Sequence, residues 1–208
     1  MEINKIYCMD ALEFLKGFPD NYADLILTDP PYGIGASKGA HSDKMAKIKR
    51  YEDEWDNKTP EKEIFQEILR VGKEVMIFGG NFFTDKIPVG THWLVWDKKG
   101  DGNFKNNYSD AELIWTNIKR TNVKKYTVIQ QGFIAEEKAR LHPTQKPVAL
   151  IMNILEDYTT PGQIIMDPFI GSGTTAVAAK KLGRNFIGCD ILQKYTDMSN
   201  KRLESQWI

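Results

Sequence analysis

The sequence has only two cysteines and no long apolar run. Cys8 and Cys189 are too few and too far apart for a zinc cluster or a disulfide framework, so neither is expected. No stretch approaches the roughly 18 uninterrupted apolar residues of a membrane span, and the polar start does not resemble a signal peptide. Together these absences predict a reduced, cytoplasmic protein without a structural metal.

The chain also has no excess of charge of either sign. Its 28 lysines and arginines balance its 28 aspartates and glutamates, so a nucleic-acid partner can be argued only from local charge. Internal repeats and low-complexity tracts are missing as well. With 208 residues, 41% of them hydrophobic, length and composition indicate one α/β domain, residues 1–208, with a sizeable core.

What the chain does contain is a β-rich run that ends at two prolines. The run 23–27 predicts a buried strand, and Asp29, Pro30, Pro31 and Tyr32 follow it closely. Because prolines carry no N–H, Asp29 and the Pro30 carbonyl remain as acceptors at the strand end. A planar group bearing an NH2 suits this site, since its amine can donate to both acceptors while its ring stacks on Tyr32. The alternative is a tight proline turn with a surface tyrosine.

A second motif combines a strand, a glycine-rich turn and a helix. The strand at 163–166 runs into Asp167-Pro168-Phe169-Ile170-Gly171-Ser172-Gly173-Thr174-Thr175. Gly171 and Gly173 let a ligand lie against bare backbone, and the helix N-terminus supplies N–H donors. About twenty residues later another strand ends in Asp190, where an acid can accept both hydroxyls of a ribose. The spacing is not G-x-G-x-x-G, so a nicotinamide dinucleotide fits poorly.

Three motifs in this order resemble those of the β-group of DNA amino-methyltransferases. They are Asp-Pro-Pro-Tyr at 29–32, His-Pro-Thr-Gln-Lys-Pro at 142–147 and Asp-Pro-Phe-x-Gly-Ser-Gly-Thr-Thr at 167–175. The resemblance spans residues 7–190 and implies a Rossmann-like, S-adenosylmethionine-dependent methyltransferase fold with a seven-stranded mixed sheet and a circularly permuted motif order. It further implies methyl transfer from S-adenosylmethionine to adenine N6 or cytosine N4 of a DNA base flipped out of the duplex, with no metal.

Seven strand candidates fit that fold in one spatial order. The order is 3–8, 185–189, 163–166, 23–28, 75–78, 111–115 and 93–96, with one antiparallel strand near the edge. The topological switch point then lies between the strands at 163–166 and 23–28, where open α/β sheets bind ligands. The two motifs, distant in sequence, are therefore expected to meet at one crevice.

Helices are expected between these strands. One begins near Asp10, one follows Thr59-Pro60-Glu61 with the Thr59 hydroxyl as its cap, and others span 147–158, 174–182 and 193 onward. The segment 117–141 has no strong pattern.

The motifs and the resemblance together assign residues to the site. The catalytic set is Asp29, Pro30, Pro31 and Tyr32. The cofactor-binding set is Asp10, Asp29, Lys146, Asp167, Phe169, Gly171, Ser172, Gly173, Thr174 and Asp190. Asp10 is equally well explained as a helix N-cap, and His142 receives no catalytic role.

Two basic, weakly patterned stretches are candidates for contact with DNA phosphates. They lie in the loop 33–57 and the segment 117–141, and their residues are Lys38, Lys44, Lys47, Lys49, Arg50, Lys119, Arg120, Lys124 and Lys125. A solvated face is the alternative. The family usually has a longer recognition region at the position of 117–141, so recognition is limited, shared with the loop 33–57, or contributed by a second subunit of a homodimer.

The target base and the substrate class have alternatives. Asp at the start of the catalytic motif favours adenine, because the resembling cytosine N4 enzymes more often have Ser there. RNA or a protein amide presents the same planar NH2, and a non-catalytic cofactor-binding partner is a further alternative. The intact Asp29, Tyr32 and Gly171-Ser172-Gly173 argue against the last.

Overall fold

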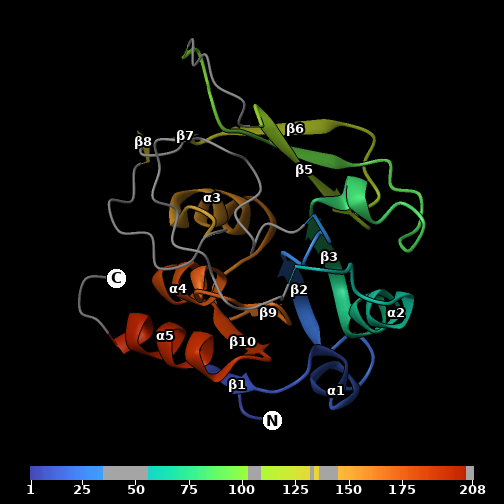
Figure 1. The fold of residues 1–208 in the computed structure, drawn as a ribbon, viewed down its shortest axis with the longest axis vertical. Coiled ribbons are helices and arrows are strands. Elements are labelled where there is room, and N and C mark those ends of the chain that lie inside the picture. Colours follow the sequence, from blue (N-terminus) through green and yellow to red (C-terminus); the bar gives the residue numbers. More distant parts are fainter. Residues whose placement is uncertain (35–55, 103–108, 132–133, 136–144, 205–208) are drawn as a thin grey trace.

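An open sheet of eight strands forms the centre of the structure, with helices on both faces (Figure 1). The computed structural model describes residues 1–34, 56–102, 109–131, 134–135 and 145–204. In spatial order the strands are β1 (Lys5–Cys8), β10 (Asn185–Asp190), β9 (Ile164–Asp167), β2 (Ala23–Thr28), β3 (Gly72–Phe78), β5 (Ala111–Thr116), β4 (Trp93–Asp97) and β6 (Val123–Thr127). A separate short pair is formed by β7 (Gln130–Gln131) and β8 (Ile134–Ala135).

The predicted spatial order of the seven strands is confirmed. β9 pairs in parallel with both β10 and β2, and β2 pairs in parallel with β3. β5 is antiparallel to both of its neighbours, β3 and β4. From β9 the chain continues to β10 and from β2 to β3, in opposite directions along the sheet. The topological switch point therefore lies between β9 and β2, as expected.

The prediction of seven strands in this sheet is wrong by one, because the described residues form eight. β6 lies within the segment 117–141 and pairs in parallel with β4 at the edge of the sheet. Of its five residues only Tyr126 is buried, while Lys124 and Lys125 occupy its middle. An edge strand that buries one side chain leaves almost no apolar alternation in the sequence, which explains why the pattern was not detected.

Helices cover the two faces of the sheet in separate groups (Figure 1). On one face lie α1 (Ala11–Lys16) and α2 (Lys62–Val71), and on the other lie α3 (Val148–Tyr158), α4 (Thr174–Lys181) and α5 (Gln193–Glu204). A 3₁₀ turn, η2 (Gly80–Phe82), follows β3. Within the described ranges no helix is both long and apolar enough to cross a membrane.

The central strand β2 shows how the core is built on both faces. Leu25 and Leu27 belong to the hydrophobic cluster on the α3 and α4 side, whereas Ala23 and Ile26 belong to the cluster with Phe65 of α2. All of these side chains are fully buried. A strand covered on both faces reads as a continuous apolar run, which is the pattern that predicted it.

The helix starts show one correct cap and one wrong cap. Asp10 caps α1, because its Oδ1 accepts from the backbone N–H groups of Leu12 at 2.8 Å and Glu13 at 3.2 Å. The predicted cap by Thr59 is wrong, since α2 begins at Lys62 and the Thr59 hydroxyl instead accepts from Lys86 Nζ at 2.5 Å. The helices expected at 147–158 and 174–182 agree with α3 and α4 within one residue at either end.

Candidate functional site

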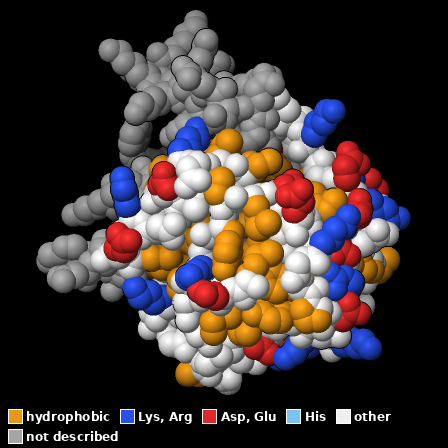
Figure 2. Space-filling view, turned by 90° about the horizontal axis from the view of Figure 1, so that it is seen from below, with side chains coloured by type: hydrophobic (Ala, Val, Ile, Leu, Met, Phe, Trp, Pro, Cys, Tyr) orange, Lys and Arg blue, Asp and Glu red, His pale blue; other side chains and the backbone are white. Residues whose placement is uncertain are grey.

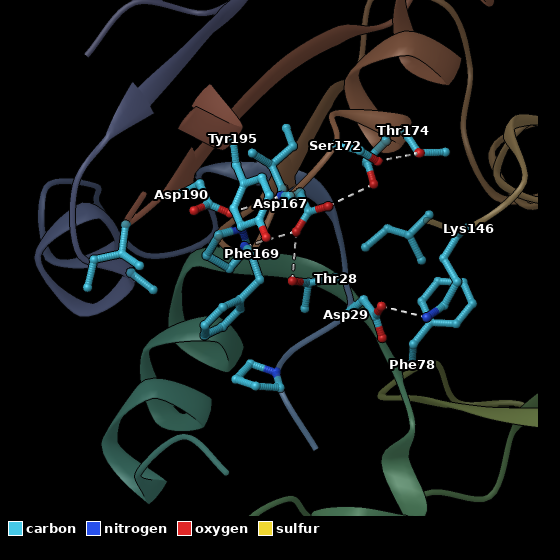
Figure 3. Close-up of a pocket in the computed structure, with 18 of the residues that line it drawn as sticks. Thr28, Asp29, Phe78, Lys146, Asp167, Phe169, Ser172, Thr174, Asp190 and Tyr195 are labelled. Atoms are coloured by element: carbon cyan, nitrogen blue, oxygen red, sulfur yellow. Dashed lines mark hydrogen bonds and ion pairs between the residues drawn. The ribbon is translucent and has the colours of Figure 1, made fainter. Parts of the chain in front are cut away.

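A cavity of about 330 Å³ lies at the carboxyl ends of β2, β9 and β10 (Figure 3). Both sequence motifs contribute to its walls, so the two distant segments meet as the switch point predicts. The predicted site residues that line it are Asp10, Asp29, Pro31, Lys146, Asp167, Phe169, Gly171, Ser172, Thr174 and Asp190. Three others, Pro30, Tyr32 and Gly173, are described but are not among the residues that line it.

Asp167 links the two strands on either side of the switch point. Its Oδ1 accepts from the Thr28 hydroxyl at 2.8 Å and from the Phe169 N–H at 3.0 Å, and its Oδ2 accepts from the Thr175 hydroxyl at 2.7 Å. Burial raises the pKa of Asp167 to about 6. All three partners are neutral donors, so this carboxylate fixes the end of β2 against the end of β9. No sequence pattern singled out Thr28 for this contact.

The glycine-rich turn is held from behind by α5. Ser199 Oγ donates to the Gly171 carbonyl at 2.7 Å, and Arg202 donates to the Ser172 carbonyl at 3.1 Å. Gly173 has a φ of +78°, and a Cβ there would lie 2.9 Å from the Cβ of Ser199. By contrast, a Cβ on Gly171 would meet no atom nearer than 4.0 Å. The turn is therefore closed toward α5 and leaves open space at Gly171.

Asp190 completes this half of the cavity. Its Oδ2 accepts from the Gly171 N–H at 3.2 Å and its Oδ1 from the Leu192 N–H at 2.8 Å. Burial raises its pKa, and these two backbone donors oppose the shift. Each carboxylate oxygen has two acceptor positions, so both oxygens can still accept a hydroxyl from the cavity.

Asp29 has charged partners instead. Lys146 Nζ lies 2.5 Å from its Oδ2 and 3.1 Å from Glu112 Oε1 (Figure 3 shows the Asp29–Lys146 pair). The Tyr32 hydroxyl lies 2.5 Å from Asp29 Oδ1 and 2.5 Å from Glu112 Oε1, and donates its single proton to one of them at a time. Lys98 Nζ lies 2.7 Å from Glu112 Oε2. The result is a buried cluster of two carboxylates, two ammonium groups and one phenol.

The charges in this cluster shift one another's pKa. Burial raises the pKa of Asp29, and Lys146 only partly opposes that shift. Burial alone would also raise the pKa of Glu112, but Lys146 and Lys98 outweigh it and lower that pKa to about 2. Burial acts on Lys146 in the opposite sense, yet the two carboxylates keep its pKa above the ordinary value. The cluster thus holds Glu112 and Lys146 as a charged pair beside Asp29.

The Tyr32 ring has an aromatic neighbour on one face. It stacks on Phe82 with ring centroids 4.8 Å apart and an interplanar angle of 13°, and it meets Phe83 edge-on at 6.0 Å. Phe82 itself is 40% exposed. Base stacking by Tyr32 remains a prediction. Gly79 and Lys146 also lie close to the ring, since a Cβ on Gly79 would be 2.4 Å from it and Lys146 Nζ is 5.8 Å from its centre.

Glu112 is the residue of the cluster that sequence reasoning missed. It is the second residue of β5, and β5 runs antiparallel to β3. The start of β5 therefore lies at the same end of the sheet as the carboxyl ends of the neighbouring parallel strands. The predicted order placed 111–115 beside 75–78 and one antiparallel strand near the edge, but it did not say which strand was antiparallel.

The predicted basic contacts are only partly described. Lys38, Lys44, Lys47, Lys49 and Arg50 lie outside the described residues, as do the first three residues of the motif at 142–147. Lys119 and Arg120 follow the end of β5, at the edge of the sheet opposite the cavity. On β6, Lys124 pairs with Asp157 at 2.6 Å and Lys125 with Asp97 at 3.1 Å.

Comparison with known proteins gives concordant matches. Residues 83–201 match the N6_N4_Mtase family, described as DNA methylase. The chain is 27% identical over 244 residues to the type II methyltransferase M.HpaI of Haemophilus parainfluenzae, covering 98% of this chain and 75% of that protein.

Two solved structures extend the comparison. The M1.HpyAVI–SAM complex is 25% identical with a TM-score of 0.64, over 97% of this chain and 99% of that one. The cytosine-N4-specific PvuII DNA methyltransferase is 15% identical with a TM-score of 0.63, over 100% of this chain and 92% of that one, which shows a shared fold.

Proposed function

This chain belongs to the DNA methylase family of S-adenosylmethionine-dependent N6/N4 methyltransferases, and on that premise we propose that it methylates adenine N6. The observation that carries the proposal is the position of Asp29, on the wall of a cavity that the glycine-rich turn also lines. One methyltransferase domain, residues 1–208, holds both motifs. Because its relative M.HpaI comes from a bacterium, where DNA lies in the cytoplasm, we place the protein in the cytoplasm.

The described residues suit S-adenosylmethionine as the methyl donor. Asp190 has free acceptor positions for ribose hydroxyls, and the open space at Gly171 admits a ligand against the backbone. In this proposal the methionine end is held by Asp167, Phe169, Gly171, Gly173 and Thr174, all but Gly173 on the cavity wall, and Asp10 lies near the adenine. The bound cofactor supplies a methyl group on a sulfonium.

The chemistry asked of this chain is positioning and charge stabilisation. The cofactor would supply the methyl group with its sulfur as the leaving group, and this chain would stabilise the positive charge on the amine nitrogen until a proton passes to water. Lys146 and Tyr32 each occupy one acceptor position of Asp29, which leaves two for the amine. Hydrogen bonds from the amine to Asp29 and the Pro30 carbonyl direct its lone pair and stabilise the developing charge.

Adenine is preferred to cytosine because the motif begins with Asp29. The fold alone does not choose between the bases, since the cytosine-N4-specific PvuII enzyme shares it. A base stacked inside a duplex cannot reach this cavity, so the target is flipped out and stacks on Tyr32.

Contact with the DNA backbone falls mainly to the loop 33–57. Lys124 and Lys125 already have acidic partners, and Lys119 and Arg120 lie at the opposite edge from the cavity. On the face in Figure 2, lysines and arginines are interspersed with acidic side chains around a hydrophobic strip, without a continuous basic band. We further propose that sequence recognition is shared with a second copy in a homodimer, because the segment 117–141 is shorter than the recognition region usual in the family.

Nucleoside analysis tests the proposal directly. The purified protein is incubated with S-adenosylmethionine and long, unmethylated, mixed-sequence DNA, which is then digested to nucleosides and separated by chromatography with mass detection. We expect N6-methyladenine. N4-methylcytosine would overturn the choice of base, and methyl found only on RNA or protein offered in parallel would overturn DNA as the substrate. No transfer to any of them would leave a non-catalytic, cofactor-binding partner.

A further inference from the structure

Glu112 is a buried carboxylate at the site for which the proposed reaction has no role. Its side chain is 11% exposed, and it is not among the described residues that line the cavity. It nevertheless contacts three members of the cluster, through Lys146 at 3.1 Å, the Tyr32 hydroxyl at 2.5 Å and Lys98 at 2.7 Å. Two of these three groups in turn contact Asp29, so Glu112 is linked to Asp29 through its partners.

The cluster is assembled from four separate parts of the chain at one edge of the sheet. Asp29 follows β2, Lys98 follows β4, Glu112 begins the antiparallel β5, and Lys146 precedes α3. Burying such charges is costly unless each is paired and hydrogen-bonded, and apolar side chains of similar volume would hold the strands equally well. A cost of this kind at the wall of the cavity points to a role in the chemistry there.

The contacts of Asp29 depend on Glu112 on both sides. One oxygen of Asp29 is bound by Tyr32 and the other by Lys146, and Glu112 Oε1 binds both of these partners. Lys146 Nζ also lies 5.0 Å from the centre of the Phe78 ring and 5.8 Å from that of Tyr32, and such cation–π contacts are weaker than a buried ion pair. In the described part of the chain, Glu112 is the acceptor other than Asp29 that both the phenol and the ammonium contact.

We propose that Glu112 is a positioning residue for methyl transfer, which holds the Lys146 ammonium and the Tyr32 hydroxyl against Asp29 and so fixes the orientation of that carboxylate. The inference rests on the proposed role of Asp29 as acceptor for the target amine. Glu112 itself touches neither the base nor the cofactor. The constellation that handles the amine therefore extends beyond the Asp-Pro-Pro-Tyr segment to Glu112 of β5 and to Lys146.

The charges facing Asp29 predict opposite pH effects for two variants. Lys146 lowers the pKa of Asp29 and Glu112 raises it, while the Tyr32 hydroxyl donates to it and buried Asp167 lies on the neighbouring strand end. Removing the charge of Glu112 should therefore move the acid limb of kcat/KM to lower pH. Removing the charge of Lys146 should move it to higher pH, because the acid limb reports the essential base of the free enzyme.

Glu112→Gln is the test variant, and Glu74→Gln is its matched control. Glu74 is also a partly buried glutamate on a strand, but it lies at the start of β3, the edge away from the cavity. For E112Q we expect kcat on DNA to fall about 10- to 100-fold, with S-adenosylmethionine binding by calorimetry unchanged at a temperature below the melting transition, which the loss of a buried ion-pair partner lowers. E74Q should keep the kcat and pH profile of the unaltered protein.

The outcomes separate this inference from the proposed function. If E112Q matches E74Q in kcat and acid limb while Asp29→Ala is inactive, Glu112 has no positioning role and the proposed function stands. If Asp29→Ala retains transfer, the proposed function fails first. Should E112Q not fold, Lys146→Met carries the test, and an acid limb that stays in place or moves to lower pH overturns the inference.

Discussion

The two halves of the cavity satisfy their buried carboxylates in different ways. In the half built on β9 and β10, Asp167 and Asp190 accept hydrogen bonds from neutral backbone and hydroxyl donors. In the half built on β2, Asp29 is bound by an ammonium and by a phenol that a second carboxylate also holds. One half is a hydrogen-bonded scaffold, and the other is a cluster of ions.

This difference matches two different tasks. Neutral donors on strand ends and a helix-backed turn hold a geometry without responding to charge, as a cofactor site requires. A cluster of ions responds strongly to a change of charge nearby, because its members shift one another's pKa in a low-dielectric setting. Positive charge that develops on the target amine would arise beside Asp29, where such a response stabilises it.

The largest expected effect comes from Asp29→Ala. Removing the acceptor for the amine should lower the rate of methyl transfer by about 1,000-fold or more, while S-adenosylmethionine binding stays nearly intact. Transfer of radiolabelled methyl to DNA measures the first quantity and calorimetry the second. Asp190→Ala is the mirror variant and should weaken cofactor binding. Loss of cofactor binding in Asp29→Ala would show that the two halves of the cavity do not have separate roles.

The next largest effect is expected at the glycine-rich turn. Gly173→Ala combines left-handed backbone strain of about 1–2 kcal/mol with overpacking against Ser199 of about 1–3 kcal/mol. Gly162→Ala isolates the strain, because Gly162 has a φ of +86° and a Cβ added there would meet no atom within 4 Å. Urea unfolding should show the larger loss in Gly173→Ala, together with weaker cofactor binding. An equal decrease in the free energy of unfolding of the two variants would mean that α5 shifts to accommodate the added methyl group.

Titration of Asp167 should make the stability of the half built on β9 and β10 depend on pH. Its folded pKa of about 6 exceeds the ordinary value of 3.8, so the folded state binds the proton more tightly than the unfolded state. The free energy of unfolding therefore decreases as pH rises through this window, by up to about 3 kcal/mol, and is flat above it.

Asp167→Asn removes this titration and keeps the contacts. The amide oxygen can accept from Thr28 and Phe169, and the amide N–H can donate to the Thr175 hydroxyl. Urea unfolding at pH 4.5 and pH 7 should show the difference between the two proteins. If the free energy of unfolding changes equally with pH in both proteins, Asp167 is not the group that titrates.

The half of the cavity built on β9 and β10 could be predicted from the sequence, because its residues lie close together in the chain. Asp167, Gly171 and Gly173 lie in one motif, and Asp190 ends the next strand. Most strands were also predictable, since buried strands are marked by apolar runs, and their spatial order followed from the resemblance to the methyltransferase family. β6 was not, because a single buried tyrosine among lysines leaves no periodic signal.

The ion cluster could be predicted only in part. Asp29 and Tyr32 are marked by their prolines, but Glu112 and Lys98 belong to no motif and enter the site through the sheet. Lys146 was expected beside the cofactor and lines the cavity, but its ion pairs with Asp29 and Glu112 were not predicted. Ion pairs between residues far apart in the chain depend on topology and register, which local patterns do not encode.

The smallest effects are expected from two variants of Tyr32. One removes the aromatic ring, and the other removes only the hydroxyl that belongs to the ion cluster. Tyr32→Ala removes the stacking surface and should weaken the complex with a target oligonucleotide by about 1–3 kcal/mol. Tyr32→Phe keeps the ring on Phe82 and removes only the bridge between Asp29 and Glu112, so binding should survive while kcat and the acid limb change. If Tyr32→Phe weakens binding as much as Tyr32→Ala, the hydroxyl rather than the ring carries the affinity. The ion cluster would then take part in holding the base as well as in its methylation.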